Sequence, residues 1–402
     1  MILRKPFQTA SLILLAAAFC LTAGAETKAE AEAAAKSTAR QERNQAIEET
    51  KAAAKEGKGE AAMTDESTPA DSLAIKGETA ESHEDCGADF ATMKAAEKEA
   101  PKKKASRNDL AVYSGFTLEF QGEKSPFSLM TTTVLPKEKL SFKVIDPKEG
   151  EELSATSSEG TVTRVNSHSW TWQAPEKTGH YCVKVSRPES ADMACLQVFV
   201  LVPYNGEETL NGYPIGKYPD STTQTDDPAK QRPRGFIEVT DNNLETWISP
   251  HFQLRQFLCK GFEGYPQYVI IRTRLLLKLE MLTEEFDKAG LSGKDIYVMS
   301  GFRTPAYNAK IGNKTTLSRH TFGDAADIYI DADRDGMIDD LNKDGQTDTE
   351  DARLLHTIVK NLKREGWRKP LGGGLSLYTA TPSRSAFIHV DARGEDIFWD
   401  NL

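Results

Sequence analysis

The stretch SRHTFGDAADIYI, residues 318–330, contains the pattern that decides how the C-terminal part of this chain folds. Ile328 and Ile330 are separated by one residue, and Asp327 comes directly before them. Successive side chains of a strand point to opposite faces, so the two isoleucines share one face and Asp327 lies on the other. His320 precedes this strand in a loop. The stretch therefore predicts a strand with a carboxylate on its polar face and an imidazole just before it.

A second stretch, AFIHVDARG at residues 386–394, alternates in the same way. Ile388 and Val390 are the apolar members of the pattern, and His389 and Asp391 are the polar ones. The alternation predicts a strand whose apolar residues face the core while His389 and Asp391 face away from it.

Together the two stretches offer two imidazoles and one carboxylate from polar positions: His320, Asp327 and His389. Zn²⁺ accepts this mixed set, and three protein ligands leave a fourth position for water. A metal bound in this way lowers the pKa of its water and polarises a scissile carbonyl. The pattern indicates a catalytic zinc site.

These two stretches and SGFRTPAYN, residues 300–308, resemble the zinc D-Ala-D-Ala carboxypeptidase and murein endopeptidase family, the fifteenth metallopeptidase family, in its C-terminal-domain form. The resemblance covers about residues 245–400. It is most specific at Ser318, His320, Gly323, Ala325 and Asp327. It implies a zinc peptidase, of D,D or L,D specificity, that cleaves peptidoglycan stem peptides or cross-links, with His320, Asp327 and His389 as ligands.

The resemblance implies a role for Arg303, and the one position at which this chain departs from the family pattern raises the question of a role for Asp391. Arg303 would sit beside the metal and stabilise an oxyanion or hold a substrate carboxylate, with a structural ion pair as the alternative. Many members have a glutamate as general base three residues before the last histidine, but here that position is Ala386. Asp391 shares the strand face of His389, and it either takes the base role or orients a ligand histidine.

An acidic insert, DADRDGMIDDLNKDGQTDTED at residues 331–351, follows the first strand directly. Carboxylates at alternate positions with a glycine at position 6 are typical of EF-hand-type loops, which bind Ca²⁺ through oxygen ligands. Two registers overlap and predict calcium ligands at Asp331, Asp333, Asp335, Asp339, Asp340, Asn342, Asp344, Asp348 and Asp351. A solvated acidic turn is the alternative.

The remaining patterns predict the domain organisation. Apolar residues at four-three spacing predict a helix from Leu275 to Ala289, ended by Gly290, and a second helix around Leu354 to Leu362. Short β-type runs across residues 108–204 predict an immunoglobulin-like sandwich. The predicted order is a signal peptide (1–25), an Ala/Glu/Lys-rich helical or disordered tether (26–107), this all-β sandwich (108–204), a connector (205–265) and an α+β zinc peptidase domain (266–402).

Four cysteines remain after residue 25, and their pairing is open to three arrangements. Cys182 and Cys195 fall on the polar faces of neighbouring predicted strands, so a cross-strand disulfide between them is expected. Cys86 and Cys259 receive no assigned partner.

The N-terminus and the charge set the compartment and exclude some partners. A short apolar run followed by Ala23-Gly24-Ala25 predicts a cleaved signal peptide and hence export to the periplasm or cell envelope. No later stretch has the length and apolarity of a membrane span. The formal net charge of −10 argues against non-specific binding of nucleic acid.

Three functional hypotheses follow from the sequence. The first is a zinc peptidase that acts on peptidoglycan peptides, either as a carboxypeptidase or as an endopeptidase. The second is a peptidoglycan-binding module that keeps the pocket but has lost catalysis. The third is a calcium-dependent adhesion or scaffold protein in which the sandwich carries the function.

Overall fold

The computed structural model describes residues 112–399 apart from residues 146, 149, 189, 220–230, 314 and 382–383. The predicted signal peptide, the predicted tether and Cys86 lie outside the described residues. All described residues belong to one compact unit, Ala80–Leu402. Among them, no helix has the length and apolar character needed to cross a membrane.

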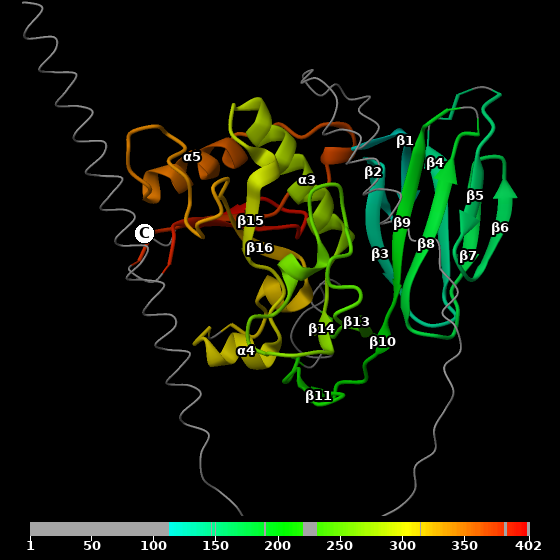
Figure 1. Ribbon diagram of the computed structural model, residues 1–402, viewed down its shortest axis with the longest axis horizontal. Helices are drawn as coiled ribbons and strands as arrows, with labels where there is room; N and C mark the ends of the chain where they lie inside the picture. Colours follow the sequence, from blue (N-terminus) through cyan, green and yellow to red (C-terminus); the bar gives the residue numbers. More distant parts are fainter. Residues whose placement is uncertain are drawn as a thin grey trace, which may run out of the picture. The chain divides into compact units, whose positions relative to one another are not determined.

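The first part of this unit is a β-sandwich of two sheets (Figure 1). One sheet has the order β2-β1-β4-β7-β6 and the other the order β3-β9-β8-β5. Trp172 and Tyr181, one from each sheet, meet between them with ring centroids 6.1 Å apart. The strands are β1 (Tyr113–Phe120), β2 (Glu123–Phe127), β3 (Leu129–Val134), β4 (Lys139–Ile145), β5 (Ser154–Ser157), β6 (Thr161–Asn166), β7 (Ser169–Gln173), β8 (Gly179–Ser186) and β9 (Met193–Val200). The immunoglobulin-like assignment of this sandwich stays a prediction.

The expected disulfide between Cys182 and Cys195 is wrong. Cys182 is disulfide-bonded, whereas Cys195 and Cys259 are outside any disulfide. In the ladder between β8 and β9, Cys182 lies opposite Gln197, and Cys195 lies opposite Lys184. The two cysteines are therefore diagonal neighbours, which are about 7 to 8 Å apart and too distant for a disulfide. Alternation correctly predicted that the strands are neighbours but not their register.

Among the described residues of the predicted connector, 205–265, are the short strands β11, β12 and β13 and the 3₁₀ helix η2, with β10 just before it and β14 just after it. β10, β13 and β14 form a three-stranded sheet, and β11 pairs with β12. These elements are β10 (Val202–Pro203), β11 (Thr209–Leu210), β12 (Tyr213–Pro214), β13 (Gly235–Val239), η2 (Leu254–Phe257) and β14 (Gln267–Val269).

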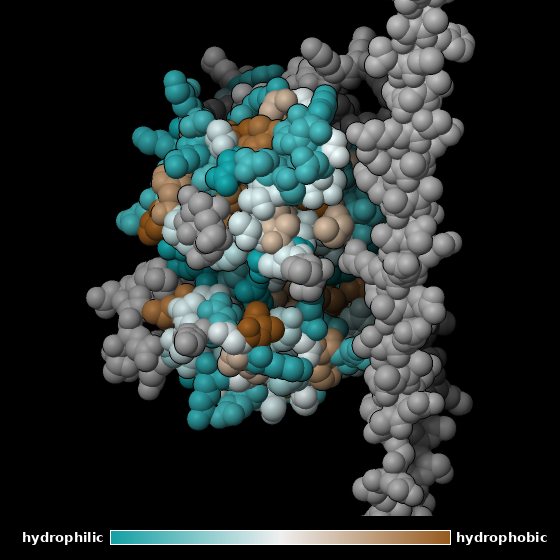
Figure 2. Space-filling view, turned by 90° about the vertical axis from the view of Figure 1, so that its left-hand side faces the viewer, coloured by the Kyte–Doolittle hydropathy of each residue, from teal (hydrophilic) through white to brown (hydrophobic). Residues whose placement is uncertain are grey.

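The C-terminal part is α+β, with one mixed sheet of order β15-β16-β18-β17-β19. Its helices and strands are α3 (Thr273–Lys288), η3 (Gly293–Asp295), β15 (Ile296–Ser300), α4 (Pro305–Lys310), η4 (Arg319–Phe322), β16 (Ala325–Ile330), α5 (Thr349–Lys360), η5 (Gly366–Arg368), β17 (Gly374–Tyr378), β18 (Phe387–Asp391) and β19 (Ile397–Phe398). Seen from the side of this sheet, the surface is mainly hydrophilic and is hollowed across its middle (Figure 2).

Helix α3 forms as its spacing predicts. Leu275, Leu279, Leu282 and Phe286 are all buried, and the helix stops before Gly290, whose φ of 81° few other residues adopt without strain. The helix also contacts the sandwich, since the Thr273 hydroxyl donates to the carbonyl oxygen of Thr131 at 2.8 Å. The sandwich is thus fixed directly against the helix that supports the C-terminal sheet.

Candidate metal centre

Strand register brings the two C-terminal stretches together. β16 pairs antiparallel with β18, and Asp327 lies directly opposite His389. His320 comes from η4, which ends at Gly323 with a φ of 72°. A Cβ on Gly323 would lie 2.4 Å from the carbonyl oxygen of Ile270. Only glycine therefore allows the chain to turn here from His320 into β16.

The three predicted ligands form a buried triangle of donor atoms. His320 Nε2 lies 3.2 Å from His389 Nδ1, His389 Nδ1 lies 3.0 Å from Asp327 Oδ1, and His320 Nε2 lies 3.3 Å from Asp327 Oδ1. All three residues are buried: His320 and Asp327 are each 3 % exposed, and His389 is 7 % exposed. With metal–ligand bonds of about 2.0 to 2.1 Å, the corners of a tetrahedron are about 3.3 Å apart. The donor set and its spacing therefore fit a zinc ion.

A backbone carbonyl fixes the orientation of the His320 ring. His320 Nδ1 lies 2.8 Å from the carbonyl oxygen of Gly301, so this nitrogen carries the proton and donates. The lone pair of Nε2 then faces the triangle, as a metal ligand requires. Gly301 is itself confined, because a Cβ there would lie 2.8 Å from the Cα of Phe257.

Arg303 pairs with the outer oxygen of Asp327. Its Nη2 contacts Asp327 Oδ2, and its Nε donates to the Ser300 hydroxyl at 2.8 Å. The sequence left two roles open for Arg303, and this geometry favours the ion pair. The guanidinium fixes the ligand carboxylate and leaves Oδ1 of Asp327 to face the histidines.

Asp391 lies on the other side of the His389 ring. Its Oδ2 is 3.4 Å from His389 Nε2, the nitrogen that faces away from Asp327. The carboxylate is fully buried and accepts hydrogen bonds from Arg393 Nε at 2.9 Å and from the Gly374 N–H at 2.8 Å. Burial alone would raise the pKa of Asp391, but His389 and Arg393 outweigh it and hold that pKa below its usual value. The geometry favours an orienting role over the general-base role.

The charges of the triangle keep its carboxylate ionised. Burial opposes ionisation of Asp327, but His320, His389 and Arg303 outweigh it and hold the pKa of Asp327 well below its usual value. Burial lowers the pKa of His320, whereas the carboxylates of Asp327 and Asp391 overcome burial and raise the pKa of His389. For Asp327 and His320 these shifts favour the ionised carboxylate and the neutral imidazole, the protonation states that bind a cation, whereas His389 must lose a proton before it can bind one.

Sequence analysis missed Lys278, a buried lysine on α3 beneath the centre. Its Nζ donates to the backbone carbonyl of Asp391 at 2.6 Å. Burial lowers the pKa of Lys278 to about 8, and the Asp391 charge opposes this shift. The sequence does hold a signal, because Lys278 lies three residues after Leu275 and four before Leu282, on the face predicted to be buried.

Trp399 was also missed. Its ring centroid lies 5.3 Å from that of His389, and the Arg393 guanidinium lies 5.4 Å from the Trp399 ring. No spacing rule marks this residue, because its position depends on the parallel pairing of β19 with β17.

A second group of carboxylates stands in the acidic insert. Asp331, Asp333 and Asp335 have oxygens within 4.8 Å of one another. The backbone N–H of Asp335 donates to Asp331 and Asp333 at 3.1 Å, and the N–H of Gly336 donates to Asp331 at 3.1 Å. Arg334 and Gly336 have positive φ values of 61° and 83°. The run therefore forms a tight loop around its carboxylates.

The second predicted loop repeats this geometry nine residues later. The N–H of Asp344 donates to Asp340 at 3.1 Å and to Asn342 at 2.9 Å, and the N–H of Gly345 donates to Asp340 at 2.9 Å. Lys343 and Gly345 have positive φ values of 63° and 88°. Two copies of one loop conformation follow each other.

The remaining predicted calcium ligands, Asp339, Asp348 and Asp351, accept backbone N–H groups of the insert and of α5. Asp351 is fully buried and accepts the N–H groups of Leu341 at 2.8 Å and Asp348 at 2.8 Å. Asp348 caps α5 by accepting the N–H of Glu350 at 2.7 Å. Asp339 accepts the N–H of Ala332 at 3.0 Å. Asp348 and Asp351 thus form a capping box at the start of α5, because both satisfy free backbone donors of its first turn.

The buried pair of histidines with a carboxylate is a donor set that fits a catalytic metal, with Asp327 and His389 on neighbouring strands of the C-terminal sheet. Residues 250–350 match the protein-family model described as Peptidase M15. The match confirms the predicted resemblance to the zinc peptidases of the D-Ala-D-Ala carboxypeptidase type. It includes His320 and Asp327 and ends before His389, which the sheet register adds. No curated protein and no solved structure was found to match the chain.

Proposed function

We propose that this protein is an exported zinc peptidase that hydrolyses amide bonds in peptidoglycan stem peptides or cross-links. The observation that carries the proposal is the triangle formed by His320, Asp327 and His389, whose donor spacing of 3.0 to 3.3 Å fits zinc. When bound, zinc would polarise the scissile carbonyl and acidify a water at its open position.

The protein's own residues hold this arrangement ready. Arg303 fixes the outer oxygen of Asp327, and the Gly301 carbonyl fixes the ring of His320. Asp391 accepts from the distal nitrogen of His389, which sets the tautomer of that ligand. Each ligand is thus oriented by a neighbour outside the triangle.

The compartment and the substrate class belong to the same proposal. The predicted signal peptide supports export to the periplasm or cell envelope, where peptidoglycan and disulfides both occur. The disulfide at Cys182 agrees with an oxidising compartment. The family type of residues 250–350 supports peptidoglycan peptides as the substrate class.

Calcium is a second part of the proposal. The repeated loop conformation in residues 331–345 supports it, because both copies gather oxygen atoms around a turn with a glycine. Burial and neighbouring carboxylates raise the pKa of Asp331 and of Asp339, as expected where negative charge is concentrated. A bound Ca²⁺ would offset this repulsion and fix the loop that follows β16.

The decisive experiment is digestion of purified sacculi by the full chain, with mass spectrometry of the released muropeptides. We expect products that differ by one hydrolysed amide bond, loss of activity with a chelator and recovery with Zn²⁺. The product masses assign carboxypeptidase or endopeptidase action and D,D or L,D specificity. Binding to sacculi without any hydrolysis, at saturating Zn²⁺, would support the non-catalytic module instead. Deleting residues 108–204 distinguishes the scaffold hypothesis from the peptidase hypothesis, because a scaffold protein would then lose all function.

A further inference from the structure

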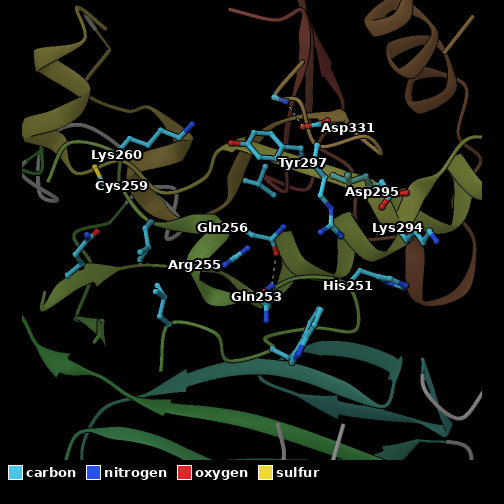
Figure 3. Close-up of a pocket in the computed structure, with 18 of the residues that line it drawn as sticks. His251, Gln253, Arg255, Gln256, Cys259, Lys260, Lys294, Asp295, Tyr297 and Asp331 are labelled. Carbon is cyan, nitrogen blue, oxygen red and sulfur yellow. Dashed lines mark hydrogen bonds between the residues drawn. The ribbon is translucent and has the colours of Figure 1, made fainter. Parts of the chain in front are cut away.

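The C-terminal sheet has two end strands, and they border different surroundings. β15, at one end, borders a groove with a volume of about 980 Å³ (Figure 3). The residues that line this groove include Tyr297 of β15 and Trp247 of the connector, but none of the three donors of the triangle. At the other end, Trp399 follows β19 directly, and its ring reaches His389. The surroundings of the His389 ring are therefore formed at the β19 end of the sheet and not by the groove.

His389 is held by a longer hydrogen bond than His320. The carbonyl oxygen of Gly301 lies 2.8 Å from His320 Nδ1, whereas Asp391 Oδ2 lies 3.4 Å from His389 Nε2. Hydrogen bonds between nitrogen and oxygen in proteins are usually about 2.7 to 3.2 Å long. The torsion that turns a histidine ring is broad and roughly two-fold, so a long hydrogen bond restrains it weakly. A further contact is needed to keep His389 Nδ1 facing the triangle.

The indole ring of Trp399 supplies such a contact. Its centroid lies 5.3 Å from that of His389, and the two ring planes are inclined by 50°. The same indole lies 5.4 Å from the guanidinium of Arg393, which donates to both oxygens of Asp391 at 2.9 and 3.0 Å. A cation is attracted to an aromatic face, and the attraction grows when water is excluded. The ring therefore contacts both the ligand histidine and the cation that fixes its carboxylate partner.

The backbone holds Trp399 in this position. β19 pairs parallel with β17, and the N–H of Trp399 donates to the carbonyl oxygen of Leu375 at 3.2 Å. The two residues of β19, Ile397 and Phe398, are 42 % and 47 % exposed, whereas Trp399 is half-buried. The segment thus turns its largest ring inward, toward His389, and leaves the smaller apolar side chains outside.

Glycines on β17 and just before it leave room for this ring. A Cβ on Gly374 would lie 2.8 Å from two ring carbons of Trp399 and closer still to Asp391 Oδ2. The backbone of Gly374 has no positive φ, so space and not conformation requires glycine there. The N–H of Gly373 donates to Asp396 at 3.1 Å, which fixes the segment that leads to Trp399. The local sequence therefore accommodates the indole at this place.

We propose that Trp399 is a positioning residue for the metal ligand His389: its ring restricts rotation of the imidazole and shields the hydrogen bond to Asp391 from water. The inference rests on the metal centre of the proposed function and adds the residue that completes the orientation of its third ligand. Without the indole, His389 keeps its place on β18 but turns more freely, so affinity for the metal falls while the fold remains.

The zinc affinity of the full chain, measured by competition with a chromophoric chelator, tests this role. Trp399→Leu removes the ring and should weaken zinc binding by roughly 10-fold, the lower end of what changes around a metal ligand cost. Trp399→Phe keeps an aromatic ring and should restore most of the affinity. Trp247→Phe, the same change at a tryptophan that lines the groove, is the matched control and should bind zinc like the wild type. Equal affinities of Trp399→Leu and the wild type would overturn the proposal.

Quenching of tryptophan fluorescence by a bound metal gives a readout that a merely structural residue would not change. Co²⁺ accepts nitrogen and oxygen ligands as Zn²⁺ does, and it quenches an indole that lies close to it. Co²⁺ should therefore quench the metal-free wild type and Trp247→Phe, and most of this quenching should be lost in Trp399→Phe. Undiminished quenching in Trp399→Phe would reject the contact between Trp399 and the centre, even if Trp399→Leu does not fold.

These measurements need no peptide substrate, so they separate this inference from the proposed function. Zinc binding that depends on Trp399, in a chain that does not hydrolyse sacculi, would support the inference and reject the peptidase. Hydrolysis of sacculi by a chain whose zinc affinity Trp399→Leu does not change would reject the inference and leave the peptidase intact. A wild-type chain that binds neither Zn²⁺ nor Co²⁺ would reject both.

Discussion

The donor triangle and the acidic insert are two candidate cation sites, one within β16 and one directly after it. They are built in opposite ways. Asp327 lies within β16, whereas Asp331 follows the strand directly. The triangle collects its donors from η4, β16 and β18, and all three are buried. The first loop of the insert takes its carboxylates from one run of five residues, and Asp333 and Asp335 are exposed.

This difference teaches how each site obtains its geometry. The sheet ladder and the partners Arg303 and Asp391 orient the triangle, so its shape does not depend on the cation. The loop holds its carboxylates only through its own backbone N–H groups. We therefore expect the cation of the triangle to govern catalysis, and the cation of the insert to govern stability.

Replacing a ligand of the triangle should have the largest effect. His389→Ala removes one of three donors and leaves a buried carboxylate facing a gap, so zinc binding and sacculus hydrolysis should both fall to background. Metal analysis and muropeptide release measure the two losses. His168→Ala, the same change in the sandwich, should keep both. Hydrolysis by a folded His389→Ala protein would rule out the triangle as the catalytic site.

The orienting role of Asp391 predicts a smaller, separable effect. Asp391→Asn should weaken zinc affinity by roughly 10- to 100-fold, because a residue that orients a ligand has been changed. Turnover should recover when Zn²⁺ is raised to saturation. If zinc affinity is unchanged and turnover at saturating Zn²⁺ falls by roughly 10²- to 10⁴-fold, Asp391 is the general base after all.

Lys278, buried beneath the donor triangle, should make the stability of the protein depend on pH in the alkaline range. The pKa of Lys278 is lowered from 10.5 to about 8, so between these values the unfolded chain binds more protons there than the folded one. The free energy of unfolding should therefore rise with pH across this window, by up to about 3 kcal/mol. Urea unfolding of Lys278→Met should lack this rise. Lys139→Met, at an exposed site, should keep it, and parallel profiles for all three proteins would contradict the prediction.

Calcium should give the smallest effect, on stability and on zinc retention. With Ca²⁺ at about 100 times its Kd, binding to the folded state alone adds about 2.7 kcal/mol. We expect a higher melting temperature and tighter zinc retention in millimolar Ca²⁺, with Mg²⁺ a poor substitute. Asp335→Ala and Asp344→Ala should abolish the shift in calorimetry of the full chain. An unchanged melting temperature in the wild type would leave the insert a solvated acidic loop.

Much of the C-terminal fold was predictable because strand alternation is a local property. The strands predicted within residues 318–330 and 386–394 are β16 and β18, and the helix predicted from Leu275 to Ala289 matches α3 within a few residues. Two of the three donors of the triangle, Asp327 and His389, were found by the same rule, because they stand at polar positions between buried apolar ones. His320 lies outside the strands, and the family resemblance supplied it as a ligand.

What the sequence did not predict depends on register and on ring orientation. The predicted disulfide between Cys182 and Cys195 was wrong because Cys182 lies opposite Gln197, two residues along β9 from Cys195, and this offset separates the two cysteines. The base role of Asp391 depended on which nitrogen of His389 it meets, and alternation does not determine that. Lys278 stayed hidden because a lysine is seldom buried, and only the packing of α3 under β18 places it there.

The separation of the donor residues along the sequence predicts the order in which the two sites form during folding. His320 and His389 are 69 residues apart, whereas the N–H of Asp335 meets Asp331 across four residues. Contacts between distant residues require closure of a long loop, so they form late in folding, and local turns form early. During refolding, the acidic loop should exist before the triangle does. Zinc binding during refolding would then report that the sheet has formed, and its rate would measure this late step of folding.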